Sequence, residues 1–393
     1  MDKRWTNRLT SRNGKVNFNA FNKRNVNPSR QASKLRHMKF PELNKNILKA
    51  LQAGTVIPAH PLALKENLKL DERRQRLLTQ YYIACGVGGL AVGVHTTQFE
   101  IRKSGIDLLE PVLKITAEEI EKSASKQAFI KVAGVVGPTS QATREAETAK
   151  RLGYDLALVS MGGLNEYSED QLIEHSRTVA SIIPVFGFYL QPAVGGRLLS
   201  YDFWRRFVEI PNVYAIKVAA FNRYQTLDVL RAVCHSDSRE RIALYTGNDD
   251  NIVADLVTPF QFSVNGKLVE KKFVGGLLGH WAVWTKSAVG LLQKIKMQKT
   301  NDDVIQKLLS EGVKVTDMNA AIFDVANSFH GCIPGIHEVL RRQGLLEGRW
   351  CLNPKEQLSR GQMEEIDRVI QSYPEYVDDE FVKEFLEKMN VNA

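Results

Sequence analysis

Short apolar runs alternate with amphipathic segments over most of this chain. The runs are nearly continuous in apolar residues, as expected of strands buried on both faces. There are eight of them, at residues 54–62, 89–94, 128–137, 156–161, 184–190, 213–221, 242–249 and 273–280. Helical periodicity fills the gaps, for example at residues 72–85, 139–152 and 168–183. This alternation predicts an α/β fold with a parallel sheet. Eight units favour closure into a (β/α)8 TIM barrel, with an open doubly wound sheet as the alternative.

Two departures from this alternation mark the end of the predicted barrel. Residues 262–269 alternate around Asn265-Gly266, a pair that favours a tight hairpin turn, so we expect an inserted hairpin just before the last strand. After about residue 300 only helical patterns remain, at residues 302–326, 335–346, 359–373 and 378–390. The sequence therefore predicts a barrel over residues 39–300 and a C-terminal helical appendage over residues 301–393.

The positive charge of the chain is confined to its N-terminus. The chain has a formal net charge of +9, and residues 1–38 carry ten basic residues and one acidic residue. The other residues carry 43 basic and 43 acidic side chains, so a nucleic-acid partner is not expected. Residues 1–38 are rich in Asn and poor in aliphatic residues, which predicts a disordered basic tail. A dispensable extension, with Met38 as the true first residue, is the favoured interpretation; a polyanion-binding arm and a mitochondrial-type presequence are the alternatives.

Composition otherwise indicates a globular protein of the cytoplasm. No apolar run approaches the roughly 20 residues that cross a bilayer, and the basic N-terminus is not followed by the apolar core of a signal peptide, so we expect no membrane association. The four cysteines, Cys85, Cys234, Cys332 and Cys351, form no C-x-x-C pair. We therefore expect reduced, mostly structural cysteines and a cytoplasmic location.

Lys217 is the most informative candidate for chemistry. It lies within the apolar run Ala215–Ala219 of the predicted sixth strand. Burial of an amine disfavours its charged form and lowers its pKa, and a neutral amine is the nucleophile that Schiff-base formation requires. The alternative is a lysine at a strand end whose amine reaches water. Lys131 has similar neighbours, but it lies early in its strand, away from the end at which barrels hold their catalytic groups.

Other polar residues follow the predicted strands. Tyr189 has a hydroxyl that could transfer a proton, although a core aromatic residue is the commoner case. Thr96 and Thr97 offer donors to a carboxylate, or are ordinary strand-end residues. The segment Gly247–Asp250 could bind a hydroxylated substrate, or it could simply form a turn of the chain.

Three histidines lie near the ends of predicted strands, at His60, His95 and His280. No carboxylate or cysteine joins them at the spacing of metal ligands, and a lone histidine is more often structural. The sequence therefore predicts neither a metal site nor a cofactor.

Four of these segments together resemble the dihydrodipicolinate synthase / N-acetylneuraminate lyase family of class I aldolases. The segments are Thr96-Thr97 with Glu100, Tyr189-Leu-Gln-Pro192, Ile216-Lys217 and Gly247-Asn-Asp-Asp250, and 28 residues separate Tyr189 from Lys217. The resemblance implies that Lys217 forms an imine with a small carbonyl substrate and that Tyr189 relays protons. It also implies that Thr96 and Thr97 hold a carboxylate, that Gly247 binds substrate, and that the protein is a homo-oligomer.

The sequence also departs from that family. The arginine that follows Tyr-x-x-Pro is absent, since Arg197 comes later, and the loop Gly162–Asn165 lacks the second tyrosine of dihydrodipicolinate synthase proper. The longer segment after the second strand also allows Thr97-Gln98, instead of Thr96-Thr97, to face the carboxylate. These departures imply a divergent branch with a different aldehyde partner.

The function expected from this resemblance is a Schiff-base-forming lyase or aldolase. It would act on a 2-keto acid or related carbonyl substrate and would cleave or form a carbon–carbon bond. One alternative is an imine-dependent hydro-lyase (dehydratase) acting on a deoxy-keto sugar acid, which would also use Lys217. The other is a non-catalytic barrel with a binding role.

Overall fold

The computed structural model describes residues 40–123, 128–297 and 302–391, and its centre is a sheet of eight parallel strands. The strands are β1 (Val56–Pro58), β2 (Gly89–Val92), β3 (Ile130–Val135), β4 (Leu156–Ser160), β5 (Val185–Leu190), β6 (Val213–Ala219), β7 (Ala243–Thr246) and β10 (Phe273–Leu278). They pair in the order β1-β10-β7-β6-β5-β4-β3-β2. The two ends of this order meet where the His60 N–H donates to Ala91 O at 2.8 Å. The predicted (β/α)8 barrel is therefore confirmed, and each predicted strand contains an observed one.

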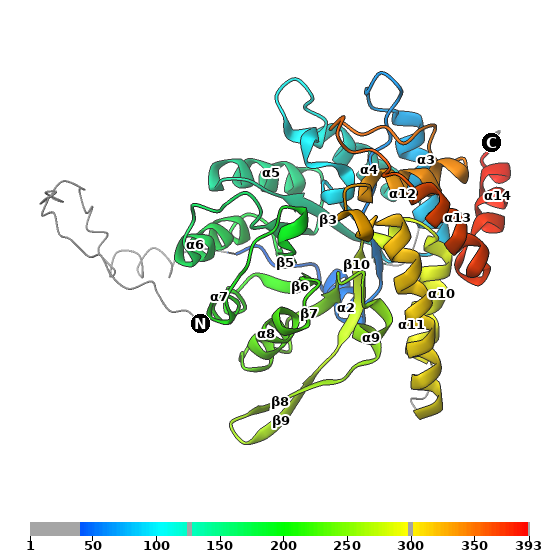
Figure 1. Ribbon diagram of the computed structural model, residues 1–393. Helices are drawn as coiled ribbons and strands as arrows, with labels where there is room; N and C mark the ends of the chain where they lie inside the picture. The colour runs from blue at the N-terminus through cyan, green and yellow to red at the C-terminus, as the bar shows by residue number, and fades with distance from the viewer. Residues whose placement is uncertain (1–39, 124–127, 298–301, 392–393) are drawn as a thin grey trace, which may run out of the picture. The chain divides into compact units, whose positions relative to one another are not determined.

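Helices follow the strands and surround the barrel (Figure 1). They are α3 (Glu72–Cys85), α4 (Leu109–Lys122), α5 (Thr139–Arg151), α6 (Glu169–Ala180), α7 (Tyr201–Phe207), α8 (Arg223–Cys234), α9 (Ile252–Val257) and α10 (Thr285–Met297). Local sequence fixes where they begin: Ser168 caps α6, accepting from Gln171 N at 3.3 Å, while the Gln171 side chain accepts from Ser168 N at 2.8 Å.

The strands have an inner and an outer apolar face because side chains alternate along a strand. The inner cluster includes Leu158, Phe186 and Ala215, and the outer cluster packs under the helices. An additional helix, α2 (Lys45–Ala53), contributes Ile47 and Leu51 to the inner cluster and so covers the N-terminal end of the barrel. The opposite end, where the strands finish, carries the polar residues selected from the sequence.

The inserted hairpin lies where the sequence predicted it. Strands β8 (Phe260–Val264) and β9 (Lys267–Lys271) pair antiparallel and project from the barrel (Figure 1). Asn265 and Gly266 form the turn with φ values of 50° and 74°. Both residue types tolerate this left-handed conformation, which explains why the pair is a reliable hairpin signal.

The C-terminal helices pack on the barrel. They are α11 (Asp302–Ile322), α12 (Cys332–Arg342), α13 (Gln362–Ser372) and α14 (Asp379–Lys388). The Tyr81 hydroxyl of α3 donates to Asp378 at 2.6 Å, just before α14, and the described residues from Phe40 onward belong to one compact unit. The predicted boundary at residue 300 and the predicted tail, residues 1–38, lie outside the described residues.

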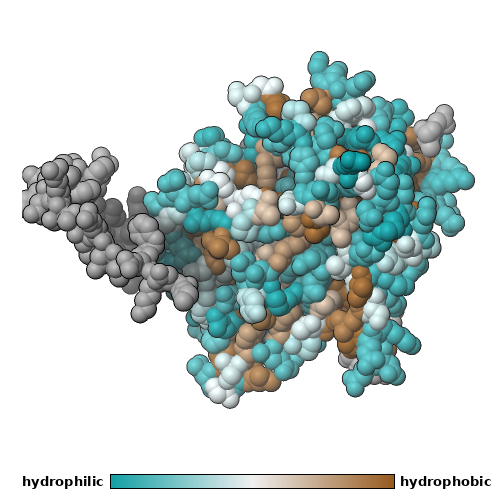
Figure 2. Space-filling view, viewed as in Figure 1, coloured by the Kyte–Doolittle hydropathy of each residue, from teal (hydrophilic) through white to brown (hydrophobic). Residues whose placement is uncertain are grey.

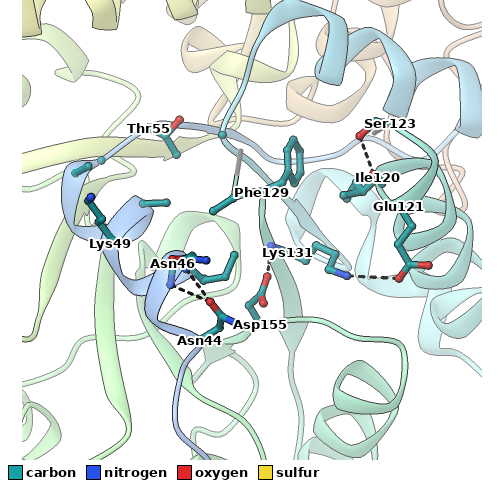
Figure 3. A pocket seen from close by; sticks show the side chains of 16 residues that line it. Asn44, Asn46, Lys49, Thr55, Ile120, Glu121, Ser123, Phe129, Lys131 and Asp155 are labelled. Atoms are coloured by element: carbon teal, nitrogen blue, oxygen red, sulfur yellow. Dashed lines mark hydrogen bonds and ion pairs between the residues drawn. The ribbon is translucent and has the colours of Figure 1, made fainter. Parts of the chain in front are cut away.

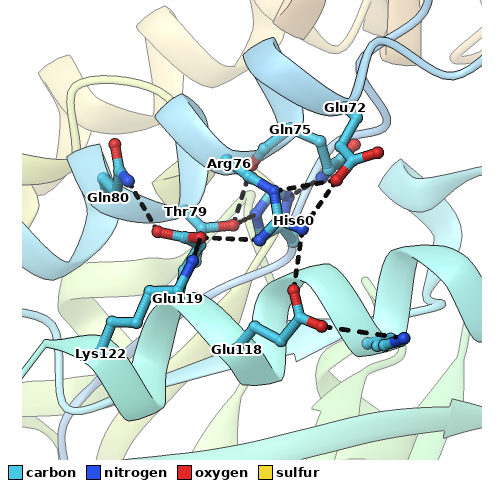
Figure 4. A network of polar contacts seen from close by, with 10 residues as sticks. His60, Glu72, Gln75, Arg76, Thr79, Gln80, Glu118, Glu119 and Lys122 are labelled. Atoms are coloured by element: carbon cyan, nitrogen blue, oxygen red, sulfur yellow. Dashed lines mark hydrogen bonds and ion pairs between the residues drawn. The ribbon is translucent and has the colours of Figure 1, made fainter.

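A polar network joins α3 to α4 and to the end of β1 (Figure 4). The Arg76 guanidinium of α3 donates to Glu118 and Glu119 of α4 at 2.8 Å each. His60, directly after β1, contacts Thr79 Oγ1 of α3 through Nε2 at 2.9 Å, and burial lowers the pKa of His60 to about 4. His60 is therefore a neutral structural group that holds α3 against the barrel.

The visible surface is mainly hydrophilic, with apolar side chains scattered among the polar ones (Figure 2). Within the described ranges, no helix combines the length and the apolar character needed to span a membrane.

Candidate active site

A cavity of about 50 Å³ lies at the carboxyl ends of the strands. The barrel contributes walls from β5 and β6 and from the segments that follow β1, β2, β7 and β10, and the C-terminal region contributes a cover. The barrel residues include Ala59, Val94, His95, Thr96, Phe188, Lys217, Ala219, Gly247, Asp249 and Gly279, and those of the cover are Phe323, Phe329 and Cys332. The structure thus places Lys217, Thr96 and Gly247 at one cavity.

Lys217 extends into this cavity because of its place on β6. Ala215 and Ala219, two residues before and after it, belong to the inner cluster, so the same alternation turns Lys217 inward. Lys217 is only 7% exposed, and its Nζ lies 4.6 Å from the centre of the Phe188 ring. Burial lowers the pKa of the Lys217 amine, and the negative charge of Asp249 opposes this shift. The residue is therefore poised to lose its proton more readily than an ordinary lysine.

Asp249 is the principal residue that the sequence reasoning did not single out. It follows β7 and lines the cavity, with its Oδ1 accepting from the His280 backbone N–H at 2.7 Å. Burial raises the pKa of the Asp249 carboxyl, while this hydrogen bond and the charge of Lys217 oppose the change. The sequence shows two carboxylates, Asp249 and Asp250, soon after a buried strand, which is where a barrel holds its catalytic groups. It does not show which of the two faces the cavity.

Gly247 leaves the space that the Lys217 side chain occupies. A Cβ at position 247 would lie 2.6 Å from Lys217 Cε and 2.9 Å from Ala219 Cβ. We therefore expect Gly247→Ala to displace the amine and to slow imine trapping of a 2-keto acid by about 10-fold or more, since small misplacements of reacting groups have large effects. The control is Gly290→Ala in α10, where an added Cβ meets nothing within 4 Å. Equal trapping rates in the two variants would contradict this role for Gly247.

The two threonines after β2 have different environments. Thr96 lines the cavity and donates its hydroxyl proton to Ala59 O at 2.8 Å. Thr97 Oγ1 donates to His60 O at 2.6 Å and accepts from the N–H groups of Gly93 and Val94 at 3.0 and 3.2 Å. Thr97 is therefore committed to the turn and does not line the cavity. The Gln98 side chain is likewise engaged elsewhere, accepting from Leu352 N at 2.6 Å.

Tyr189 does not reach Lys217, which corrects the prediction that its hydroxyl relays protons. Tyr189 belongs to the outer cluster and packs against Trp204 of α7, with ring centres 5.3 Å apart. Among the described residues, its hydroxyl hydrogen-bonds with the backbone of Leu199, at 3.3 and 3.4 Å. Phe188 occupies the inward position and pairs with Lys217 across the sheet. Successive residues of a strand point to opposite faces of the sheet. Because Phe188 faces the Lys217 cavity, the next residue, Tyr189, points towards the surrounding helices.

We accordingly expect Tyr189→Phe to have little effect on turnover. The substitution removes two long hydrogen bonds to the Leu199 backbone and should lower the free energy of unfolding by about 1–3 kcal/mol. Steady-state kinetics should show a loss of less than about 3-fold, well below the 10²-fold that removal of an acid–base group typically causes. A loss of 100-fold or more, with the fold intact, would restore Tyr189 as the relay.

His95 lies beside Lys217 and lines the same cavity. Burial, followed by the positive charge of Lys217, lowers the pKa of His95 to about 4. Its imidazole is therefore neutral near pH 7.

Lys131 lies at the other end of the barrel. It lines an open cavity of about 1170 Å³ beside α2, among residues that precede the strands, such as Thr55 and Phe129 (Figure 3). Its Nζ is 3.7 Å from Glu121 Oε1, and its backbone N–H donates to Asp155. Although this cavity is larger, its lysine is paired with a carboxylate, and barrels hold their catalytic groups at the opposite end. Lys131 is thus a natural internal control for Lys217.

Known proteins share both the fold and part of the sequence. The chain is 29% identical to the N-acetylneuraminate lyase of Citrobacter koseri over 205 residues, or 51% of this chain and 65% of that protein. It is also 29% identical to the N-acetylneuraminate lyase of Escherichia coli over 191 residues, or 48% of this chain and 60% of that protein. The chain therefore matches less than two thirds of the length of these two relatives.

Solved structures of low sequence identity have the same fold. A prophage protein of the dihydrodipicolinic acid synthase family from E. coli K12 superimposes with a TM-score of 0.67 at 17% identity, covering 83% of this chain and 99% of that one. The N-acetylneuraminate lyase of Fusobacterium nucleatum gives a TM-score of 0.63 at 16% identity, covering 84% and 100%.

The sequence pattern of the dihydrodipicolinate synthetase family matches residues 52–260, more than half of the chain. This range contains strands β1 to β7, with Lys217, and ends before β10 and the C-terminal helices. On this match the chain belongs to the dihydrodipicolinate synthetase family.

Proposed function

We propose that this protein is a lyase of the class I aldolase type that forms a Schiff base between Lys217 and a 2-keto acid. The observation that carries the proposal is the position of the Lys217 amine, buried in a small cavity at the catalytic end of the barrel with its pKa lowered by that burial. The names of the relatives agree with it: two are N-acetylneuraminate lyases, and the structure of the prophage protein is a complex with pyruvate.

The proposed reaction follows from the chemistry of a neutral amine. The Lys217 nitrogen attacks the keto carbon, and loss of one water leaves an imine. Loss of a proton from the neighbouring carbon gives an enamine, whose carbon bonds to an aldehyde carbon while the aldehyde oxygen takes up a proton. Water then hydrolyses the imine and frees the amine. The same steps in reverse cleave the carbon–carbon bond.

Asp249 and His95 are the proposed proton carriers. Both line the Lys217 cavity, which supports this assignment. Burial raises the pKa of Asp249, which favours exchange of a proton near neutral pH, whereas His95 is neutral there. We further propose that Thr96 holds the substrate carboxylate through its backbone N–H, because its hydroxyl proton is already donated to Ala59 O.

Solvent exchange tests this proposal without knowledge of the aldehyde partner. Enamine formation and its reversal should replace the methyl hydrogens of pyruvate with deuterium when the protein and pyruvate are incubated in D2O, which proton NMR measures directly. Absence of exchange above the background rate with pyruvate and 2-oxobutyrate alike would contradict the proposal. An imine-dependent hydro-lyase would also exchange these hydrogens, and product analysis with a deoxy-keto sugar acid separates it from an aldolase.

Location and assembly complete the proposal. All four cysteines are buried and unpaired, which supports a reducing compartment such as the cytoplasm. Leu309 and Val313 on α11 are exposed apolar residues, 41% and 69% exposed, which supports a homo-oligomer that covers them. Sedimentation of the purified protein would test the second point.

A further inference from the structure

A second cavity lies directly outside the one that holds Lys217. Its volume is about 550 Å³, and we refer to it as the outer cavity. The two cavities share His95, Val194 and Phe329 in their walls, so they meet at these three side chains. A keto acid bound at Lys217 would therefore face the outer cavity across a short boundary.

The C-terminal region builds most of the outer cavity. Its residues there are Asn327, Ser328, Phe329, His330, Ile333, Asn353, Lys355 and Glu356. All of them follow residue 260, where the match to the family ends. Most of the wall of the outer cavity is thus a part of the chain that the family pattern does not describe, whereas His95 and Val194 at the boundary lie within the match.

Hydrogen bonds hold this wall in place. Asp324 accepts from Asn327 Nδ2 at 2.7 Å and from Gly331 N at 2.9 Å. The Gln98 side chain accepts from Leu352 N at 2.6 Å and so ties the segment to the turn after β2. Phe329 packs edge-on against Phe221, with ring centres 5.8 Å apart. These contacts tie the two segments of the wall to the C-terminal region and to the barrel.

Five ionisable side chains line the outer cavity: Glu100, Glu356, Lys355, His95 and His330. Glu100 and Glu356 both line it, and burial together with the charge of Glu100 raises the pKa of Glu356. Glu356 Oε2 is buried and has no hydrogen-bond partner among the described residues. Lys355, the one lysine in this lining, is exposed, and Arg197 turns away to donate to Leu164 O at 2.6 Å.

We propose that the outer cavity binds the aldehyde partner, and that this partner carries hydroxyl or amino donors and no carboxylate or phosphate. The proposal rests on the imine-forming function proposed above. A donor group would satisfy the unpaired Glu356 oxygen, whereas an anionic group placed against that carboxylate would be repelled by it. Glu100 contributes less, because it is paired with Lys103 at 3.5 Å. Glu356 is then a specificity-determining residue supplied by the C-terminal region.

Matched aldehydes test this inference in the full-length protein. With pyruvate as donor, D-glyceraldehyde carries hydroxyl groups and no charge, while succinic semialdehyde carries a carboxylate. We expect kcat/KM to favour glyceraldehyde by at least about 10-fold. Glu356→Gln removes the charge but keeps the shape, and should reduce that preference by about 3-fold or more. The control is Glu364→Gln, an exposed carboxylate of α13 outside the cavity, which should leave the preference unchanged.

Borohydride trapping of pyruvate, run on the same samples, tests imine formation separately from aldehyde binding in the outer cavity. If trapping occurs but succinic semialdehyde is used as well as glyceraldehyde, or if Glu356→Gln leaves the preference unchanged, the assignment of the outer cavity is wrong and the proposed function stands. Absence of trapping in the unmodified protein would overturn both. Trapping with the expected preference, altered by Glu356→Gln alone, would support both.

Discussion

Lys217→Ala is expected to abolish turnover and the exchange of pyruvate hydrogens with solvent. The substitution removes the only atom that can form the proposed imine at this cavity, and loss of a covalent nucleophile lowers rates on the order of 10⁴-fold or more. The fold should persist, because the variant no longer buries an amine beside Phe188. Proton NMR measures the exchange rate, and thermal unfolding checks the fold.

Lys131→Ala is the matched control for this prediction. Lys131 also lies on a barrel strand, but it lines the cavity at the opposite end and contacts Glu121. Its replacement should leave exchange and turnover within about 2-fold, because residues at the N-terminal face of a barrel contribute mainly to stability. A Lys217→Ala variant that retains exchange, or a Lys131→Ala variant that loses it, would reverse the assignment.

Asp249→Asn is expected to reduce turnover by about 10²- to 10⁴-fold, the range typical of a general acid–base group. Asparagine keeps an oxygen for the His280 N–H but cannot carry the proton. The variant should also change the pH dependence of trapping. The charge of Asp249 raises the pKa of Lys217, so its removal should lower that pKa further. The neutral amine would then form at a lower pH, and the midpoint of the trapping rate should move in the acidic direction.

The control is Asp250→Asn, since Asp250 is exposed and does not line the Lys217 cavity. Turnover and the trapping midpoint should both stay close to those of the unmodified protein. If Asp249→Asn shifts the midpoint but retains turnover, the role of Asp249 is limited to raising the pKa of Lys217, and Asp249 carries no proton. His95 would then be the remaining proton carrier at this cavity.

The barrel could be predicted because each strand is a short apolar run separated from the next by a helical segment. The hairpin was equally accessible, because Asn265-Gly266 encodes its own turn. Lys217 could be identified because a lysine in an apolar strand is rare and chemically informative. Each of these features depends on a short stretch of sequence. The family match over residues 52–260 agrees with the order of the first seven strands.

The remaining features depend on which face or which distant segment a residue meets. Phe188 and Tyr189 are both apolar enough to be buried, so composition could not decide which one faces Lys217. The charge of Asp249, which acts on Lys217, comes from the segment after a neighbouring strand, and the cover from Phe329 comes from more than 100 residues further along the chain. Such contacts arise from tertiary packing and leave no periodic signal in the sequence.

Mass mapping of the borohydride-trapped adduct is the most direct test of the central claim. The protein is reduced with borohydride in the presence of pyruvate or 2-oxobutyrate, digested, and searched for the added mass on each lysine-containing peptide. A stoichiometric adduct is expected on the peptide that contains Lys217, and none on the peptide that contains Lys131. An adduct on Lys131, or no adduct with either keto acid, would contradict that claim.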